Sequence, residues 1–458
     1  MSNPRFSIVI PTRERADTLR HTLRTCLAQQ FDSYEIVISD NCSSPATRET
    51  VESFESPKIK YIRSDHPLAM SDNWELAVSH AVGEFVIVIG DDDGLLPHAL
   101  REIDRLLQDL GGKVLCWEQI HYGWPSVALE ELTNSIIIPL ASMDLTLQSQ
   151  EMMLRIANFD NVEWRMLPMI YHSAIHQDLI TQLREKTGRV FGAAIPDVYS
   201  GFAFAYLARQ YTSVGRPMSI RAESQKSTGI ALHFVEGNSP AADEFHALNA
   251  QARLQYHPRI PAIRALPAAI ADSFQRAKDA LFPDDASLCL DRKALAINCL
   301  RETKTYSEEE WRKSVQAIHD SLSDDAELQR WFDSEYLERP SFQPSGRRQF
   351  AWNRGFDGAH LNLDAAQFGV TDVFAAAELI DKVMGYTAQI GASVEATRKR
   401  ISFQEELEQQ IHALMDHTAA QEQALQTLSR ELNTIYGSRL WKVAQFYRTQ
   451  RKRLKFTK

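Results

Sequence analysis

The sequence of 458 residues contains no apolar run long enough to cross a membrane. A membrane-spanning helix needs roughly 18 to 20 consecutive, mostly apolar residues. The first residues, MSNPRFSIVIPT, also lack a basic leader followed by a long apolar segment, so we expect no secretion. These absences favour a cytoplasmic protein, and its length suits two or three domains.

Cysteine is scarce, and no two of the cysteines form a CxxC pair. The five residues are Cys26, Cys42, Cys116, Cys289 and Cys299. Their spacing excludes a disulfide framework and argues against a structural zinc site. We expect buried thiols in a reducing compartment.

Acidic residues are missing from the C-terminal end of the sequence. From Tyr436 onward there are eight basic residues and no acidic one, although the whole chain has a net charge of -10. The acidic body argues against general nucleic-acid binding. The basic tail predicts one localised anionic partner.

Strand and helix patterns alternate through the first hundred residues. Leu19, Leu23 and Leu27, for example, form one stripe of an expected helix. Apolar strands separated by helices predict a parallel α/β sheet covered on both faces. The expected strands are 5–12, 34–40, 59–64 and 84–90, and the expected helices are 15–30, 46–55, 71–82 and 96–110.

Polar residues follow these strands, at the sheet edge where parallel α/β sheets bind ligands. PTRER follows the first strand, SDNCSS the second, and Asp91, Asp92 and Asp93 the fourth. Two such carboxylates can bind Mg²⁺ or Mn²⁺ together with substrate phosphates. The alternative is an aspartate-rich turn exposed to water.

The rest of the chain has a less regular pattern. Strands, helices and loops are mixed from 113 to 235, and an Ala- and Leu-rich helical region follows to about 385. A diluted heptad pattern over 404–435 predicts a short coiled coil. Its seam is Gln404, Leu407, Ile411, Leu414, Thr418, Gln421, Leu425, Leu428, Leu432 and Ile435.

Two segments together resemble the nucleotide-sugar-binding half of family 2 glycosyltransferases of the GT-A fold. They are SIVIPTRERADTLRHTLRTCLAQQFDSYEIVISDNCS and SDNWELAVSHAVGEFVIVIGDDDGLLP. The resemblance is strong over 5–110 and weaker to about 235. It implies that Asp40 meets the base and that Asp92 binds the metal. The other nucleotide-sugar-binding residues it implies are Pro11, Thr12, Arg13, Glu14, Asn41 and Asp91.

The chain departs from the family pattern at one position. The common pattern is Asp-Ser-Asp-Asp, and its first aspartate aligns with Gly90. Asp91 can supply the missing carboxylate from the next position. We therefore rank the metal ligands as Asp92, then Asp91, then Asp93.

The resemblance also implies an inverting transfer, which needs a base and a cation at the diphosphate leaving group. Asp197, in IPDVYSG, is the candidate base, and Glu163 is the runner-up. Asp197 has a second interpretation, as an acid favoured by the dipole at a helix start. In ESQKSTGIALHF, Lys226, Ser227, Thr228 and His233 are candidate diphosphate or metal contacts, and His233 is a candidate metal ligand.

We expect a Rossmann-like, mostly parallel α/β sheet of GT-A type, followed by helices and a coiled coil. The transferase domain would span 1–238, with a nucleotide-sugar half over 1–110 and an acceptor half over 111–238. A helical domain over 239–386, a coiled coil over 387–436 and a basic amphipathic tail over 437–458 would follow.

The predicted function is transfer of a sugar from a UDP- or dTDP-sugar to a hydroxyl group, with Mn²⁺ or Mg²⁺, in bacterial polysaccharide or lipopolysaccharide synthesis. A glycan or lipid-linked acceptor, a second subunit and an anionic membrane surface are the expected partners. The membrane would be the inner face of the cytoplasmic membrane.

Two alternatives remain. A non-catalytic scaffold built on a degenerate transferase domain would explain Gly90. A nucleotidyltransferase would need a glycine-rich loop after the first strand, which PTRERAD lacks.

Overall fold

The computed structural model describes residues 3–140, 144–160, 164–229, 240–303, 307–337 and 353–385. The described elements form a mixed α/β structure with twelve strands in one sheet, so the predicted α/β fold is confirmed. The main path of the sheet runs β11-β12-β7-β6-β9-β4-β1-β2-β3, and β10 pairs with β5, β6 and β8. The predicted coiled coil and basic tail lie outside the described residues.

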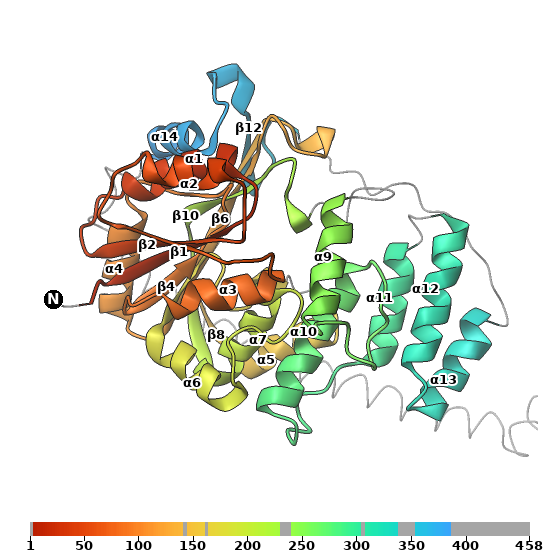
Figure 1. The fold of residues 1–458 in the computed structure, drawn as a ribbon. Helices are drawn as coiled ribbons and strands as arrows, with labels where there is room; N and C mark the ends of the chain where they lie inside the picture. Colours follow the sequence, from red (N-terminus) through yellow and green to blue (C-terminus); the bar gives the residue numbers. More distant parts are fainter. Residues whose placement is uncertain are drawn as a thin grey trace, which may run out of the picture. The chain divides into compact units, whose positions relative to one another are not determined.

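The N-terminal part is the regular half of the sheet (Figure 1). Strand β1 pairs in parallel with β2 on one side and β4 on the other, and β2 pairs in parallel with β3. The strands are β1 (Phe6–Thr12), β2 (Tyr34–Asp40), β3 (Ile59–Arg63), β4 (Phe85–Val88) and β5 (Gly94–Leu95). The helices are α1 (Ala16–Leu27), α2 (Pro45–Glu52), α3 (Met70–Ser79) and α4 (Ala99–Leu110).

Both faces of β1, β2 and β4 are buried, which explains their apolar sequences, whereas the edge strand β3 is half-buried or exposed. Ile8 of β1 packs in a cluster with Leu19 and Leu23 of α1. Val9, the next residue, points to the opposite face and packs in a cluster with Val78 of α3. The alternation of β1 side chains therefore fixes one helix on each face.

The next part of the chain adds antiparallel strands. Strand β9 inserts between β4 and β6 and is antiparallel to both, whereas β10 is parallel to β6. The strands are β6 (Val114–Gly123), β7 (Ser135–Pro139), β8 (Leu145–Gln148), β9 (Ser173–His176) and β10 (Gln210–Glu223). The helices are α5 (Ser149–Ala157), α6 (Gln177–Thr187) and α7 (Pro196–Ala208).

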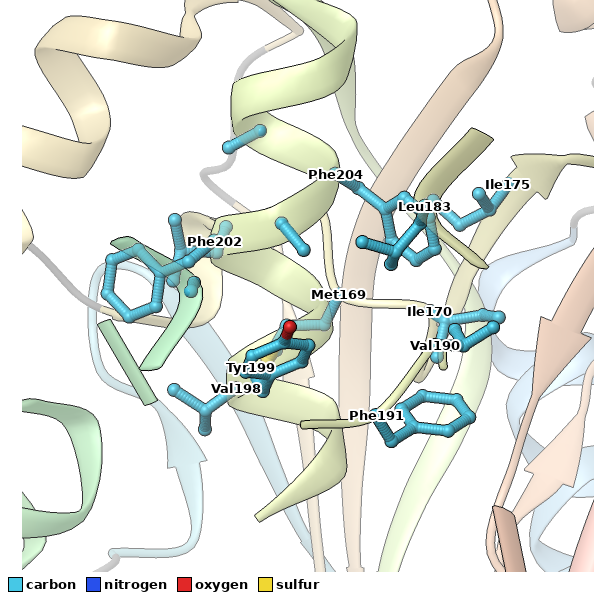
Figure 2. Packing of buried hydrophobic residues seen from close by; sticks show 14 of the residues in the cluster. Met169, Ile170, Ile175, Leu183, Val190, Phe191, Val198, Tyr199, Phe202 and Phe204 are labelled. Atoms are coloured by element: carbon cyan, nitrogen blue, oxygen red, sulfur yellow. The ribbon is translucent and has the colours of Figure 1, made fainter. Parts of the chain in front are cut away.

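Helix α7 is almost fully buried. It packs both against elements of the α/β part and against α10 of the later helical region. Figure 2 shows Phe202 and Phe204 on opposite sides of α7, with Phe204 directed toward Leu183. On the other side, the Phe202 ring lies 5.2 Å from the Phe274 ring of α10. The elements that follow are α9 (Pro240–Gln251), α10 (Leu266–Leu281), α11 (Arg292–Thr303), α12 (Glu308–Ser321) and α13 (Ala326–Phe332).

The structure differs from the predicted helical domain after residue 353. Strands β11 (Gly355–Phe356) and β12 (His360–Asp364) extend the sheet, because β12 pairs antiparallel with β7. Helix α14 (Val373–Met384) then packs against α1 and β5. The sequence HLNLD alternates in strand fashion, but it is too short to stand out from the surrounding loop residues.

None of the described helices is long and apolar enough to cross a membrane.

Candidate active site

The carboxyl ends of β1, β2 and β4 meet at one edge of the sheet. Thr12 and Asp40 are register partners at the ends of β1 and β2. The Thr12 hydroxyl donates to Asp91 Oδ2 over 2.6 Å, which joins the end of β1 to the turn after β4. The structure therefore brings the three polar segments of the sequence together.

Asp91 and Asp92 are buried, with exposed fractions of 3% and 4%, and both contact Arg15. Arg15 Nη1 lies 2.8 Å from Asp91 Oδ1, and Arg15 Nη2 pairs with Asp92 Oδ2. Burial lowers the pKa of Arg15, but the carboxylates outweigh this and raise it above its usual value. Arg15 therefore stays charged, and one guanidinium binds both carboxylates.

The pKa of Asp92 is raised to about 6. Burial is the largest cause, the negative charges of Asp93 and Asp91 add to the rise, and the Arg15 guanidinium opposes it. Burial likewise raises the pKa of Asp91, against the effects of Arg15 and Thr12. Both shifts mean that one guanidinium does not fully compensate for burying two carboxylates. More positive charge would stabilise the pair.

Residues after β10 cover Asp92. The hydroxyls of Ser224 and Ser227 donate to Asp92 Oδ2 over 2.8 and 2.9 Å. Arg15 Nη2 donates in turn to Ser224 Oγ over 2.5 Å. The Lys226 ammonium donates to the Glu14 carbonyl over 2.6 Å. Lys226 and Ser227 thus lie beside the aspartates and contact protein groups, and their predicted contact with diphosphate or metal stays a prediction.

Asp93 differs from its two neighbours because it does not pair with Arg15 and is held by four other protein groups. Its Oδ1 accepts from Ala222 N over 2.8 Å. Its Oδ2 accepts from Gly90 N at 2.6 Å and the Tyr171 hydroxyl at 2.6 Å, and it lies 3.0 Å from His172 Nε2. Although burial raises the pKa of Asp93, its contacts with His172 and Tyr171 lower it below the usual value. These contacts hold β4, β9 and β10 together, and the metal-binding role of Asp93 stays a prediction.

The position of Asp93 also explains Gly90. A Cβ atom at position 90 would lie 2.8 Å from Asp93 Oδ2 and 3.2 Å from Asp92 Oδ1. Any larger side chain would collide with the carboxylates folded back over this position. The conformation of this turn therefore favours glycine at position 90, where the family pattern has aspartate.

Asp40 is fully buried at the end of β2. Its Oδ1 accepts from Ser43 N over 2.8 Å, and its Oδ2 accepts from the Tyr61 hydroxyl and faces Arg63 Nε at 3.4 Å. These contacts fix the orientation of the carboxylate at the mouth of the expected nucleotide pocket. The base-binding role of Asp40 stays a prediction.

The other residues of the expected nucleotide pocket bind neighbouring loops. Glu14 has a positive φ of 54°, and its carboxylate accepts from Ser44 N over 2.7 Å. Asn41 Oδ1 accepts from Leu68 N over 2.7 Å. Arg13 donates to the Asn41 carbonyl over 2.7 Å and pairs with Glu244 of α9. Together with Pro11 at the end of β1, these residues shape the wall of the site.

Asp197 lies in the first turn of α7, whose N1 position is Pro196. Burial raises its pKa, while hydrogen bonds to backbone amides and the charges of Arg165 and His172 partly oppose the rise. His172 also contacts Asp93, so one imidazole links the surroundings of Asp197 to the aspartate turn. Glu163 and His233 lie outside the described residues.

Asp91 and Asp92 can hold a divalent cation. Their oxygens already converge on one cationic group, the Arg15 guanidinium, and two hydroxyl oxygens lie beside Asp92. Hard cations prefer such oxygen donors, and Mg²⁺ commonly uses one or two carboxylates with substrate phosphates. In the part of the chain that the structure describes, no three His, Cys, Asp or Glu side chains form a metal-binding group. The remaining ligands would have to come from substrate and water.

Sequence reasoning missed Arg15, Tyr171 and His172 as members of this cluster. Arg15 belongs to the same PTRER segment as Thr12 and Glu14, so its position was a usable signal. Tyr171 and His172 precede β9, and no local pattern indicated that this segment inserts beside β4.

Comparison with known proteins finds similarity in the N-terminal part of the chain. Residues 7–159 match the model of glycosyl transferase family 2. This segment is therefore similar to family 2 glycosyltransferases. Over 100 residues it is 32% identical to the GalNAc(5)-diNAcBac-PP-undecaprenol beta-1,3-glucosyltransferase of Campylobacter jejuni, covering 21% of this chain and 32% of that protein.

Two further proteins are similar to this chain. It is 30% identical over 101 residues to the putative colanic acid biosynthesis glycosyl transferase WcaA of Escherichia coli, covering 22% of this chain and 36% of that protein. The chain spans about a third of the length of these curated relatives. A crystal structure of Staphylococcus aureus TarS in complex with UDP-GlcNAc covers 73% of this chain and 91% of its own, with a TM-score of 0.40 at 13% identity.

Proposed function

We propose that this protein is a glycosyltransferase that moves a sugar from a UDP- or dTDP-sugar to a hydroxyl acceptor. The assembly of a bacterial surface polysaccharide or lipopolysaccharide is its proposed context. The observation that carries the proposal is that the carboxylates of Asp91 and Asp92 converge on the Arg15 guanidinium, beside Thr12. These residues lie in the segment that matches glycosyl transferase family 2. The names of the bacterial relatives support the glycan context.

In the proposed donor site, Asp40 binds the base or ribose and the PTRER segment forms the wall. Asp91 and Asp92 hold Mn²⁺ or Mg²⁺, and His233 stays a candidate further ligand. The bound cation would neutralise charge that develops on the diphosphate leaving group. The chain's own role there is to present two fixed, buried carboxylates at the sheet edge.

Asp197 is the proposed general base of an inverting displacement. One oxygen of the Asp197 carboxylate would take the proton of the acceptor hydroxyl while the hydroxyl oxygen attacks the anomeric carbon. Because burial raises the pKa of Asp197, its ionised form is a stronger base than an ordinary aspartate. The nucleoside diphosphate leaves with the bonding electrons.

The proposed acceptor is a glycan or a lipid-linked glycan. We further propose that the coiled coil over 387–436 pairs two subunits and that the basic tail brings them to the inner face of the cytoplasmic membrane. Those segments lie outside the described residues, and their sequence patterns carry this part of the proposal.

A thermal-shift panel of UDP, dTDP, GDP and ADP, each with and without Mn²⁺, tests the donor site. We expect UDP or dTDP with Mn²⁺ to raise the Tm, because a ligand at 100 times its Kd stabilises the folded state by about 2.7 kcal/mol. Asp40→Asn should weaken the nucleoside response, whereas Asp197→Asn should keep it and lose transfer. If no nucleotide stabilises the protein and no donor is turned over, the scaffold alternative replaces this proposal.

A further inference from the structure

Arg15 occupies the position between the two carboxylates that a cation would need. It is the N-cap residue of α1, and its side chain is only 14% exposed. Its two terminal nitrogens contact Asp91 Oδ1 and Asp92 Oδ2, one oxygen of each carboxylate. A cation that bound these two oxygens would have to take the place of Arg15 there.

The remaining oxygen of Asp91 is already used inside the protein. Asp91 Oδ2 accepts from the Thr12 hydroxyl. Asp92 Oδ2, the oxygen that Arg15 contacts, also accepts from the hydroxyls of Ser224 and Ser227. A divalent ion therefore competes directly with Arg15 for Asp91 Oδ1 and with Arg15 and two serines for Asp92 Oδ2.

We infer that Arg15 is a resident counter-ion, which a divalent cation must displace from Asp91 and Asp92 when it binds. The inference rests on the proposed cation site and implies that displacing Arg15 weakens the affinity of that site for the cation. Because a guanidinium keeps its charge throughout the physiological pH range, the competition does not depend on loss of a proton.

The displacement would extend to the residues after β10. Ser224 Oγ accepts from Arg15 and donates to Asp92, so it joins the two groups that would separate. Ser227 is held to the same Asp92 oxygen and also accepts from Ser224 N over 2.8 Å. Cation binding should therefore loosen residues 224–228 as well as free Arg15.

Mn²⁺ binding to the full-length protein without nucleotide tests the competition. Free Mn²⁺ is measured by electron paramagnetic resonance for wild type, Arg15→Gln and Arg24→Gln. We expect Arg15→Gln to bind Mn²⁺ at least tenfold more tightly than wild type. Arg24→Gln is the matched control, because Arg24 lies on the same helix but over the Phe374 ring, and its Mn²⁺ affinity should equal that of wild type.

A second measurement uses wild type and so does not depend on folding of the variant. Hydrogen exchange followed by mass spectrometry should show faster amide exchange in 224–228 when Mn²⁺ is added. Slower or unchanged exchange there would overturn the inference, as would equal or weaker Mn²⁺ affinity of folded Arg15→Gln.

These failures are distinct from failure of the proposed function. If wild type binds Mn²⁺ and Arg15→Gln binds it no better, the cation site stands and the counter-ion role falls. If neither protein binds Mn²⁺ with or without UDP, the proposed cation site falls, and the counter-ion role falls with it.

Discussion

Gly90 and Asp93 are coupled by the way the turn after β4 folds back on itself. The Asp93 carboxylate accepts from the Gly90 amide, and a Cβ atom at position 90 would lie 2.8 Å from that carboxylate. An alanine at this position must therefore push aside a carboxylate that four donors hold in place. Residue 90 is thus constrained by close packing against Asp93.

We predict that Gly90→Ala lowers the free energy of unfolding by about 1 to 3 kcal/mol, the usual cost of overpacking. Urea denaturation measures the change. Gly229→Ala is the control, because a Cβ atom there meets no atom within 4 Å, and we expect it to change stability by less than about 0.5 kcal/mol. Equal stability of Gly90→Ala and wild type would contradict the packing argument.

At the scale of single residues, the sequence singled out the aspartates of the candidate site but not Arg15. Asp91 and Asp92 were predicted from their place after a buried strand, and in the structure both pair with the Arg15 guanidinium. The Arg15 contact could not be predicted, because a long side chain in a loop can point in several directions. The contacts of Asp93 with Tyr171 and His172 could not be predicted either, because neighbouring strand-end residues look alike in sequence.

At the scale of elements, α14 shows how tertiary contacts override a local pattern. The stripe of Leu19 and Leu23 correctly predicted α1 and its buried face. The Ala- and Leu-rich region that was predicted to be helical up to about 385 includes α14 but did not indicate its partner, because α14 packs on α1, far earlier in the chain. Pairing of β12 with β7 is equally distant in sequence, so no local pattern reports it.

Two substitutions in α14 test whether its buried face stabilises the domain. Ile380 is fully buried in a cluster with Ile136 and Ile138, whereas Val383 is 44% exposed. We expect Ile380→Ala to cost about 2 to 5 kcal/mol and Val383→Ala less than about 0.5 kcal/mol. Chemical denaturation of both variants gives the comparison. Similar small costs would mean that α14 adds little to the stability of the sheet.

At the scale of the whole molecule, charge separates the acidic body from the basic tail. The tail contains eight basic residues after Tyr436 and several aromatic residues. Such a segment is attracted to anionic lipid by about 1 kcal/mol for each basic residue near the surface. The sequence of the tail thus predicts a contact with an anionic membrane surface.

We predict that full-length protein sediments with vesicles that contain anionic lipid and that a chain ending at residue 436 does not. Raised salt should weaken sedimentation because it screens the attraction. Vesicles of neutral lipid are the control for apolar insertion. If the shortened chain sediments as strongly as the full chain, the contact lies elsewhere.

The late return of the chain to its first sheet has a consequence for biosynthesis. Strand β7 ends at Pro139, but its partner β12 and the covering helix α14 are complete only at Met384. At about 5 to 20 residues per second, a ribosome needs on the order of 12 to 50 s to make the intervening segment. During that interval the nascent protein presents an unpaired strand edge and uncovered isoleucines, which are the features that chaperones protect.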